Sequence, residues 1–142
     1  MRVTRVCFVG TRTEHFEETV RLFRDVLGLS ARFENPGWSG FRLATGKRDF
    51  VEVFSDADHD ERLFPPEAGS GPVVAFAVDD LPAARSELAA AGVELIGDLV
   101  WADVLFGDPA SAGFGWCFFK GPDGNFYVLQ QDGADATEEA TS

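Results

Sequence analysis

Apolar residues recur along this chain with two different periods, which predict alternating strands and helices. The segment Arg2–Val9 is rich in β-branched and apolar residues, as expected for a first strand. The apolar residues that follow are spaced as on one face of an amphipathic helix: Phe16, Val20, Phe23 and Leu27. The chain therefore opens with a strand and a helix.

Short signals mark where this helix begins and ends. Thr11–Glu14 has the spacing of a capping box, and Gly28 follows the last apolar position. Three short strands are predicted next, separated by turns: Ala31–Glu34, Gly40–Ala44 and Asp49–Phe54. The first half thus has the order β-α-β-β-β.

The same order returns in the second half, which predicts an internal repeat. Asp80 can cap its helix and Gly92 can end it. The strands predicted around that helix are Val73–Val78, Val93–Ile96, Phe114–Lys120 and Phe126–Gln130. The long connection Gly97–Gly113 could hold one more strand in its middle. We predict one domain of two modules, about 1–56 and 72–131, with a linker at 57–71 and a disordered acidic tail at 132–142.

Composition narrows the range of partners. Of the 142 residues, 45% are hydrophobic and 13% aromatic, enough for a sizeable core. The formal net charge of −12 argues against nucleic acid and anionic membrane surfaces. An acidic protein surface would favour cationic ligands, or would simply keep the protein solvated. No apolar run approaches ~18 residues, so we expect a soluble, cytoplasmic protein.

The cysteines and histidines suggest no metal site of their own. Cys7 and Cys117 lie in strand-like runs without the spacing of a zinc site, so we expect them to pack as small apolar residues. His15 and His59 are expected on the surface. A weaker alternative places a metal at His59 among the acidic residues of its connector.

Four motifs occur in the order known from one family: Phe23–Leu29, Phe76–Leu81, Ala90–Glu94 and Pro122–Asn125. On these motifs the chain resembles the vicinal oxygen chelate superfamily, which includes glyoxalase I, extradiol dioxygenases and bleomycin-resistance proteins. The resemblance implies an α+β fold in which two βαβββ modules form a curved mixed sheet around a small-molecule cleft. It also implies a homodimer.

The resemblance further locates the metal ligands of the metal-dependent members. Their four His or Glu positions fall here on Arg5, Glu52, Val73 and Val128. Glu52 alone could bind a cation, because arginine only donates hydrogen bonds and valine has no lone pair. We therefore expect no metal cofactor. The alternative is one divalent metal ion.

Strand alternation assigns side chains to the cleft or to the helix side of the sheet. In phase with the ligand positions are Arg5, Cys7, Val9, Phe50, Glu52, Phe54, Val73, Ala75, Ala77, Phe126, Val128 and Gln130. Their neighbours Val6, Phe8, Val51, Val53, Val74, Phe76, Val78, Tyr127 and Leu129 are expected under the helices. Trp38, Trp101 and Trp116 can form the rim of a pocket or close the ends of the sheet. The predicted ligand-binding residues are Arg5, Cys7, Phe50, Glu52, Phe54, Val73, Trp101, Trp116, Phe126 and Val128.

Two charged residues in this cleft leave three interpretations open. Arg5 and Glu52 can neutralise each other across neighbouring strands, or orient a polar group of a ligand. Glu52 is also the one candidate catalytic residue, as a general base.

These observations favour a metal-independent protein that binds a small molecule, such as one that sequesters an aromatic or cationic compound. The alternatives are a metal-dependent lyase, isomerase or dioxygenase, a metal-independent enzyme that uses Glu52 as its base, and a structural module whose cleft is filled.

Overall fold

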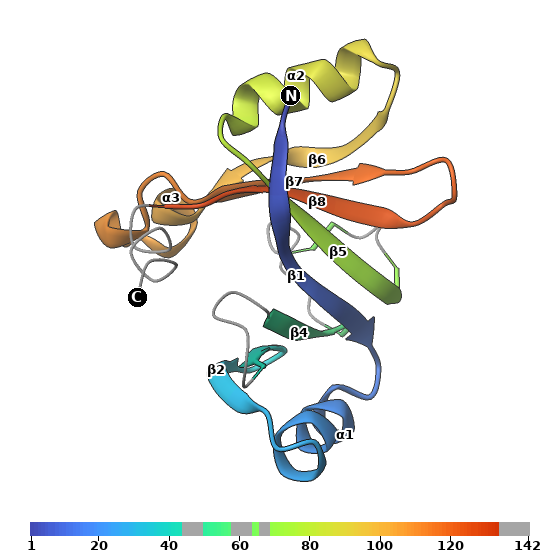
Figure 1. Ribbon diagram of the computed structural model, residues 1–142, viewed down its shortest axis with the longest axis vertical. Coiled ribbons are helices and arrows are strands. Elements are labelled where there is room, and N and C mark those ends of the chain that lie inside the picture. Colours follow the sequence, from blue (N-terminus) through green and yellow to red (C-terminus); the bar gives the residue numbers. More distant parts are fainter. Residues whose placement is uncertain (44–49, 58–63, 66–68, 134–142) are drawn as a thin grey trace.

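The two βαβββ units are present and lie side by side in one curved sheet (Figure 1). The computed structural model describes residues 1–43, 50–57, 64–65 and 69–133. The first unit comprises β1 (Val3–Thr13), α1 (Phe16–Arg21), β2 (Ser30–Asn35), β3 (Trp38–Arg42) and β4 (Phe50–Ser55). The second comprises β5 (Gly71–Val78), α2 (Leu81–Ala90), β6 (Glu94–Trp101), β7 (Gly115–Lys120) and β8 (Phe126–Gln131).

The sheet is joined at its centre by the first strand of each unit. The strand order is β2-β3-β4-β1-β5-β8-β7-β6, and β1 pairs antiparallel with β5. Each of these strands also pairs in parallel with the last strand of its own unit, β4 or β8. The predicted fold class, a curved mixed sheet of two βαβββ modules, is confirmed.

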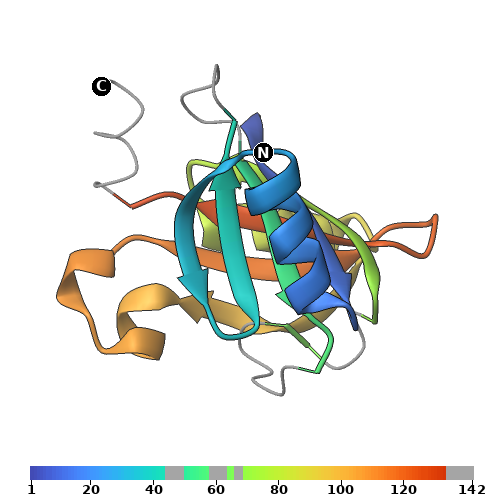
Figure 2. The same cartoon turned by 90° about the horizontal axis from the view of Figure 1, so that it is seen from below.

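The helices pack on the face of the sheet that lies opposite the cleft. Val20 of α1 packs with Phe41 and Val53 of β3 and β4, and Figure 2 shows α1 lying along these strands. Leu81 of α2 packs with Leu129 of β8 in a second cluster. A third cluster lies on the cleft face and includes Cys7, Ala75, Trp116, Phe118 and Val128. The core therefore has two layers, one on each face of the sheet.

The start of α1 differs from its prediction. Thr11 lies inside β1, which continues to Thr13, so the predicted capping box does not form. His15 takes the N-cap position without a side-chain cap, and its backbone N–H donates to the Thr13 hydroxyl. After α1 the backbone widens into a π-helix, η1 (Leu22–Val26). The apolar spacing indicated a helix but could not distinguish an α-helix from a π-helix.

The second unit follows its prediction more closely. The Asp80 carboxylate accepts from the backbone N–H of Ala83, as expected for a cap. The strand predicted at Val93–Ile96 is longer and runs to Trp101, and its pairing with β7 shifts register between Ile96 and Val100. The rest of the connection forms two short helices, α3 (Ala102–Phe106) and η3 (Pro109–Ser111).

Bulges in β1 reverse the predicted facing of part of that strand. Val6 pairs with Phe76 but Phe8 pairs with Ala75, so Cys7 is an extra residue. Beyond it, Phe8 turns to the cleft, whereas Val9 turns to the helix side and is 50% exposed. The predicted positions of these two side chains were therefore wrong. Val6 does face the helix side but stays exposed, because it lies between the helices.

Some predictions fall outside the described residues. His59, most of the linker at 57–71 and nearly all of the tail at 132–142 belong to this group. His15 is exposed and lies near Glu14 and Glu18, in keeping with a surface residue. Within the described ranges, no helix is both long and apolar enough to cross a bilayer. The cytoplasmic location stays a prediction.

We expect Gly10→Ala to lower the free energy of unfolding by about 1–3 kcal/mol. A Cβ at this position would lie 2.7 Å from the backbone oxygen of Glu52 on the neighbouring strand, so the two strands would have to move apart. Urea unfolding of the two proteins measures the difference. Val104→Ile is the control, since it adds one carbon to an exposed residue of α3 and should change stability by less than about 0.5 kcal/mol. Equal stability of Gly10→Ala and the wild type would contradict the expectation.

Candidate functional site

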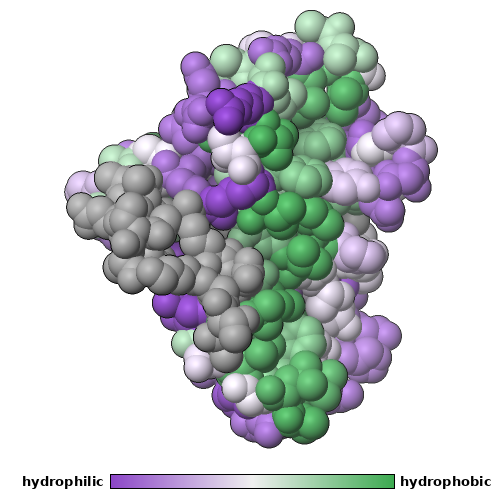
Figure 3. Space-filling model, in the orientation of Figure 1, coloured by the Kyte–Doolittle hydropathy of each residue, from purple (hydrophilic) through white to green (hydrophobic). Residues whose placement is uncertain are grey.

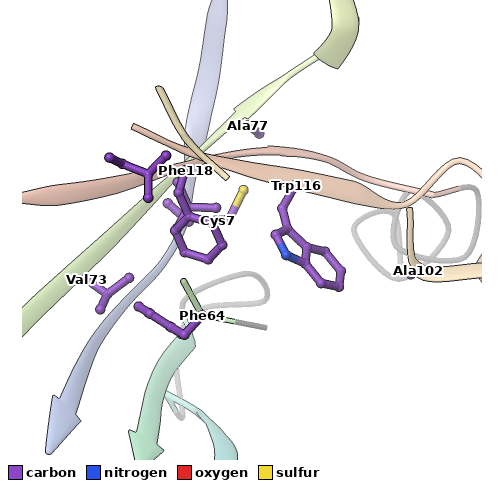
Figure 4. Close-up of a cluster of buried hydrophobic side chains, with 10 residues drawn as sticks. Cys7, Phe64, Val73, Ala77, Ala102, Trp116 and Phe118 are labelled. Carbon is purple, nitrogen blue, oxygen red and sulfur yellow. The ribbon is translucent and has the colours of Figure 1, made fainter. Parts of the chain in front are cut away.

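A cavity of about 290 Å³ lies on the concave face of the sheet and draws its lining from both units. Its walls are mainly aromatic: Phe8, Phe33, Trp38, Phe50, Phe54, Phe64, Phe114, Trp116 and Phe118. Figure 4 shows part of this wall, with Phe118 pointing toward Phe64 and the Trp116 indole beside it. The remaining lining residues are Arg5, Cys7, Arg32, Glu52, Val128, Gln130 and Asp132. This volume is near the lower end of the range for small-molecule sites.

The cavity holds a buried carboxylate, that of Glu52 on β4. Its Oε1 accepts a 3.0 Å hydrogen bond from the indole Nε1 of Trp38, on the adjacent strand β3. Burial raises the pKa of Glu52 from its ordinary value of 4.5 to about 7, although the Trp38 hydrogen bond and the nearby Arg32 guanidinium act to lower it. Near neutral pH this group therefore exists in both charge states.

Glycines flank Glu52 on both neighbouring strands. Gly10 of β1 and Gly40 of β3 are its register partners. A Cβ at Gly40 would lie 2.6 Å from the ring of Phe33, so the absence of a side chain there lets this ring cross β3 and reach the cavity. The two residues opposite Glu52 therefore carry no side chain, and aromatic rings occupy the space next to the carboxylate.

A polar cluster lies at the opposite part of the lining. Arg5 forms an ion pair with Asp132, and the Gln130 side-chain amide donates to the same carboxylate at 3.0 Å. The interpretation in which Arg5 and Glu52 neutralise each other is therefore wrong. Asp132 follows β8 directly, so Arg5 is paired by the end of the last strand and Glu52 keeps only its indole partner among the described residues.

Seven of the ten predicted ligand-binding residues line this cavity: Arg5, Cys7, Phe50, Glu52, Phe54, Trp116 and Val128. The other three lie elsewhere. Val73 and Phe126 line a second cavity of about 70 Å³. Trp101 packs against the α2 cluster, with its ring over Gly115. Whether any of these side chains contacts a ligand stays a prediction.

Sequence reasoning missed several lining residues for identifiable reasons. Phe8 was assigned to the wrong face because the β1 bulge leaves no pattern in the sequence. Phe33 and Arg32 lie on β2, a strand for which no facing was assigned. Phe64 lies in the connector, Asp132 was assigned to the tail, and Phe114 and Phe118 belong to β7 and its approach. A signal was available for Phe118, since strand alternation places it on the same face as Trp116.

Comparison by sequence alone identifies no relatives: no family model and no curated protein matches this chain. Solved structures do match. The Mn(II)-bound glyoxalase from Novosphingobium aromaticivorans is 24% identical over 92% of this chain, with a TM-score of 0.65, and the chain spans 40% of its length. Methylmalonyl-CoA epimerase from Mycobacterium tuberculosis is 20% identical over 96% of this chain and 93% of its own, with a TM-score of 0.64. A glyoxalase/bleomycin resistance protein/dioxygenase superfamily member from Vibrio splendidus 12B01 is 20% identical over 90% and 98%, with a TM-score of 0.61.

The chain has the vicinal oxygen chelate fold. The metal site of that fold does not fit the residues present here. Arg5 is ion-paired to Asp132, Val73 is buried outside the main cavity, and Val128 offers only hydrocarbon. Among the described residues, no group of three or more His, Cys, Asp or Glu side chains could hold a metal ion. Glu52 is left as the one possible ligand of the four positions, and one carboxylate does not hold a divalent ion.

Burial of Glu52 predicts an unusual pH dependence of stability. Between pH 4.5 and about 7 the folded protein binds this proton more tightly than the unfolded chain does. The free energy of unfolding should therefore fall across that window, by about 3 kcal/mol in all, and level off above it. Urea unfolding at a series of pH values measures this change in stability. The difference between the wild type and Glu52→Gln gives the part that comes from Glu52. Parallel profiles for wild type and variant would contradict the raised pKa.

Proposed function

We propose that this protein binds a small molecule in the main cavity without the help of a metal ion. The observation that carries the proposal is an aromatic cavity of about 290 Å³ in which Glu52 alone remains of the four positions that hold metal in the fold. Apolar walls with a few placed polar groups are typical of ligand sites. An aromatic or cationic compound suits this lining. Sequestration of such a compound requires no catalytic group beyond the residues that line the cavity.

A second candidate function is supported by the same carboxylate. A buried glutamate with a pKa of about 7 has the proton affinity of a general base that works at neutral pH. Such an enzyme would take a proton from its substrate with Glu52 and would need no metal. The other carboxylate of the described lining, that of Asp132, is ion-paired with Arg5, which makes binding the simpler proposal.

We further infer that the protein forms a homodimer through the helix side of the sheet. Five exposed apolar residues lie there, which we call the β1–η1 patch: Val3, Val6, Val9, Leu22 and Val26. Arg24, on the other flank of the helix, pairs with Glu34 of β2, so Leu22 and Val26 face β1. Figure 3 shows a hydrophobic band from β1 to α1. The patch is uncharged in a chain of net charge −12, so a second copy can meet it without bringing like charges together.

Metal analysis and thermal unfolding test the binding proposal together. Protein purified without chelator should contain no stoichiometric Mn, Fe, Ni or Zn, and these ions should not raise its melting temperature. A compound from a panel of aromatic and cationic molecules should stabilise it, by about 2.7 kcal/mol at a hundred times its Kd. Phe50→Ala should weaken this effect, whereas Phe106→Ala, outside the cavity, should not. Stoichiometric metal, or a panel without effect, would refute the proposal.

Sedimentation velocity tests the dimer. The wild type should sediment as a dimer, and Val26→Asp should shift it to the monomer because a buried aspartate at the interface would be unpaired. Val104→Asp is the matched control: Val104 is 81% exposed, comparable to 74% for Val26, but lies on α3 outside the patch. A monomeric wild type, or equal effects of the two substitutions, would overturn the assignment.

A further inference from the structure

We propose that the ligand of the main cavity is an organic cation, an aromatic or apolar body that carries a quaternary or other fully substituted ammonium group, and that this group lies beside Glu52. The inference rests on the proposed binding function and specifies its ligand class. It follows from three features of the lining: an incompletely paired carboxylate, the ring faces around it, and the balance of charge along the cavity wall.

Glu52 has no ion-pair partner among the residues that the structure describes. Its side chain is 6% exposed, and its Oε1 accepts from Trp38. Among the described residues no hydrogen bond reaches the second oxygen and no ion pair reaches the carboxylate. A charge removed from water is costly unless it is paired, so this site is stabilised by whatever supplies the missing positive charge. A cation in the cavity would do so at short range.

The rings around Glu52 suit a cation that cannot donate hydrogen bonds. Trp38 is stacked over Phe54 with the ring centroids 6.3 Å apart, and Phe33 meets Trp38 edge-on at 4.7 Å. An ammonium group is attracted to such ring faces, most strongly where water is excluded. The same wall already accepts cations, since the Arg32 guanidinium carbon lies 4.2 Å from the Phe50 ring centroid and that of Arg12 lies 4.9 Å from that of Phe64.

The other charged groups that face the cavity leave room for one more positive charge near Glu52. Arg5 of β1 is balanced by Asp132 after β8. Arg32 of β2 is exposed, so solvent screens it, and its effect on the pKa of Glu52 is smaller than that of burial. Arg42 of β3 lies over the Phe50 ring, 5.5 Å from its centroid. The acidic surface as a whole attracts cations toward the opening.

Binding of such a ligand must then be coupled to the proton on Glu52. A cation beside the carboxylate favours its ionised form, so binding releases a proton at neutral pH. The neutral form of Glu52 offers the cation no counter-charge, and affinity falls as it becomes populated. A neutral ligand of the same shape would show neither effect.

Two isosteric probes test the proposal: phenyltrimethylammonium and its uncharged analogue tert-butylbenzene. Binding is followed by the fluorescence of Trp38 and Trp116, which both line the cavity. At pH 8 the cation should bind at least tenfold more tightly than its analogue, and its affinity should fall about tenfold from pH 8 to pH 6, in proportion to the ionised fraction of Glu52. Glu52→Gln should remove the preference and the pH dependence but keep binding of tert-butylbenzene. Glu94→Gln, at an exposed position of β6, is the matched control and should behave as the wild type.

The outcomes distinguish failure of the cationic ligand class from failure of the proposed binding function. If the neutral probe binds the wild type as tightly as the cation, the cationic ligand class is wrong while the binding function stands. If the preference for the cation survives in Glu52→Gln, the role of Glu52 is wrong. If neither probe binds at any pH, both the ligand class and the proposed binding function are overturned.

Discussion

The antiparallel pairing of β1 with β5 is the interaction on which the rest of the structure depends. Each βαβββ unit alone would expose the edge of its first strand and would leave half of a curved wall open to water. Pairing these two edges makes one eight-stranded sheet, and its curvature brings Glu52 of the first unit opposite Trp116 and Phe118 of the second. Neither half could enclose a cavity by itself, so folding of the sheet and formation of the site are one event.

The cavity contains a group whose burial lowers the stability of the fold, the carboxylate of Glu52. Replacing Glu52 by an apolar side chain would remove a desolvated carboxylate, and glycines at its two register partners add little packing to offset it. The indole of Trp38 satisfies one oxygen, and no ion pair to the carboxylate occurs in the part of the chain that the structure describes. A buried carboxylate in an otherwise aromatic wall is the feature on which both proposed functions, binding and catalysis, depend.

Much of the fold could be predicted from the sequence, and the reasons differ from element to element. Alternation along β4 correctly placed Phe50, Glu52 and Phe54 on the cavity face, and Asp80 was correctly identified as a cap. The misses arise where backbone geometry departs from a regular repeat: the extra residue Cys7 in β1, the π-helix after α1, and the extension of β6 to Trp101. Individual side-chain pairs between distant parts of the chain could not be predicted. Nothing local to Arg5 indicates that Asp132 pairs with it, because that contact depends on where β8 ends.

The bulges of β1 also bear on how the cavity discriminates between ligands. The two units are related by an approximate two-fold axis through the β1–β5 seam, and an ideal repeat would give a cavity with two equivalent ends. The extra residues lie on β1 alone, so the two strands at the axis present different side chains to the centre. A bound molecule therefore meets an asymmetric wall and has one preferred orientation. In a perfectly two-fold cavity the two end-to-end orientations of a bound molecule would be equal in energy, whereas here they differ.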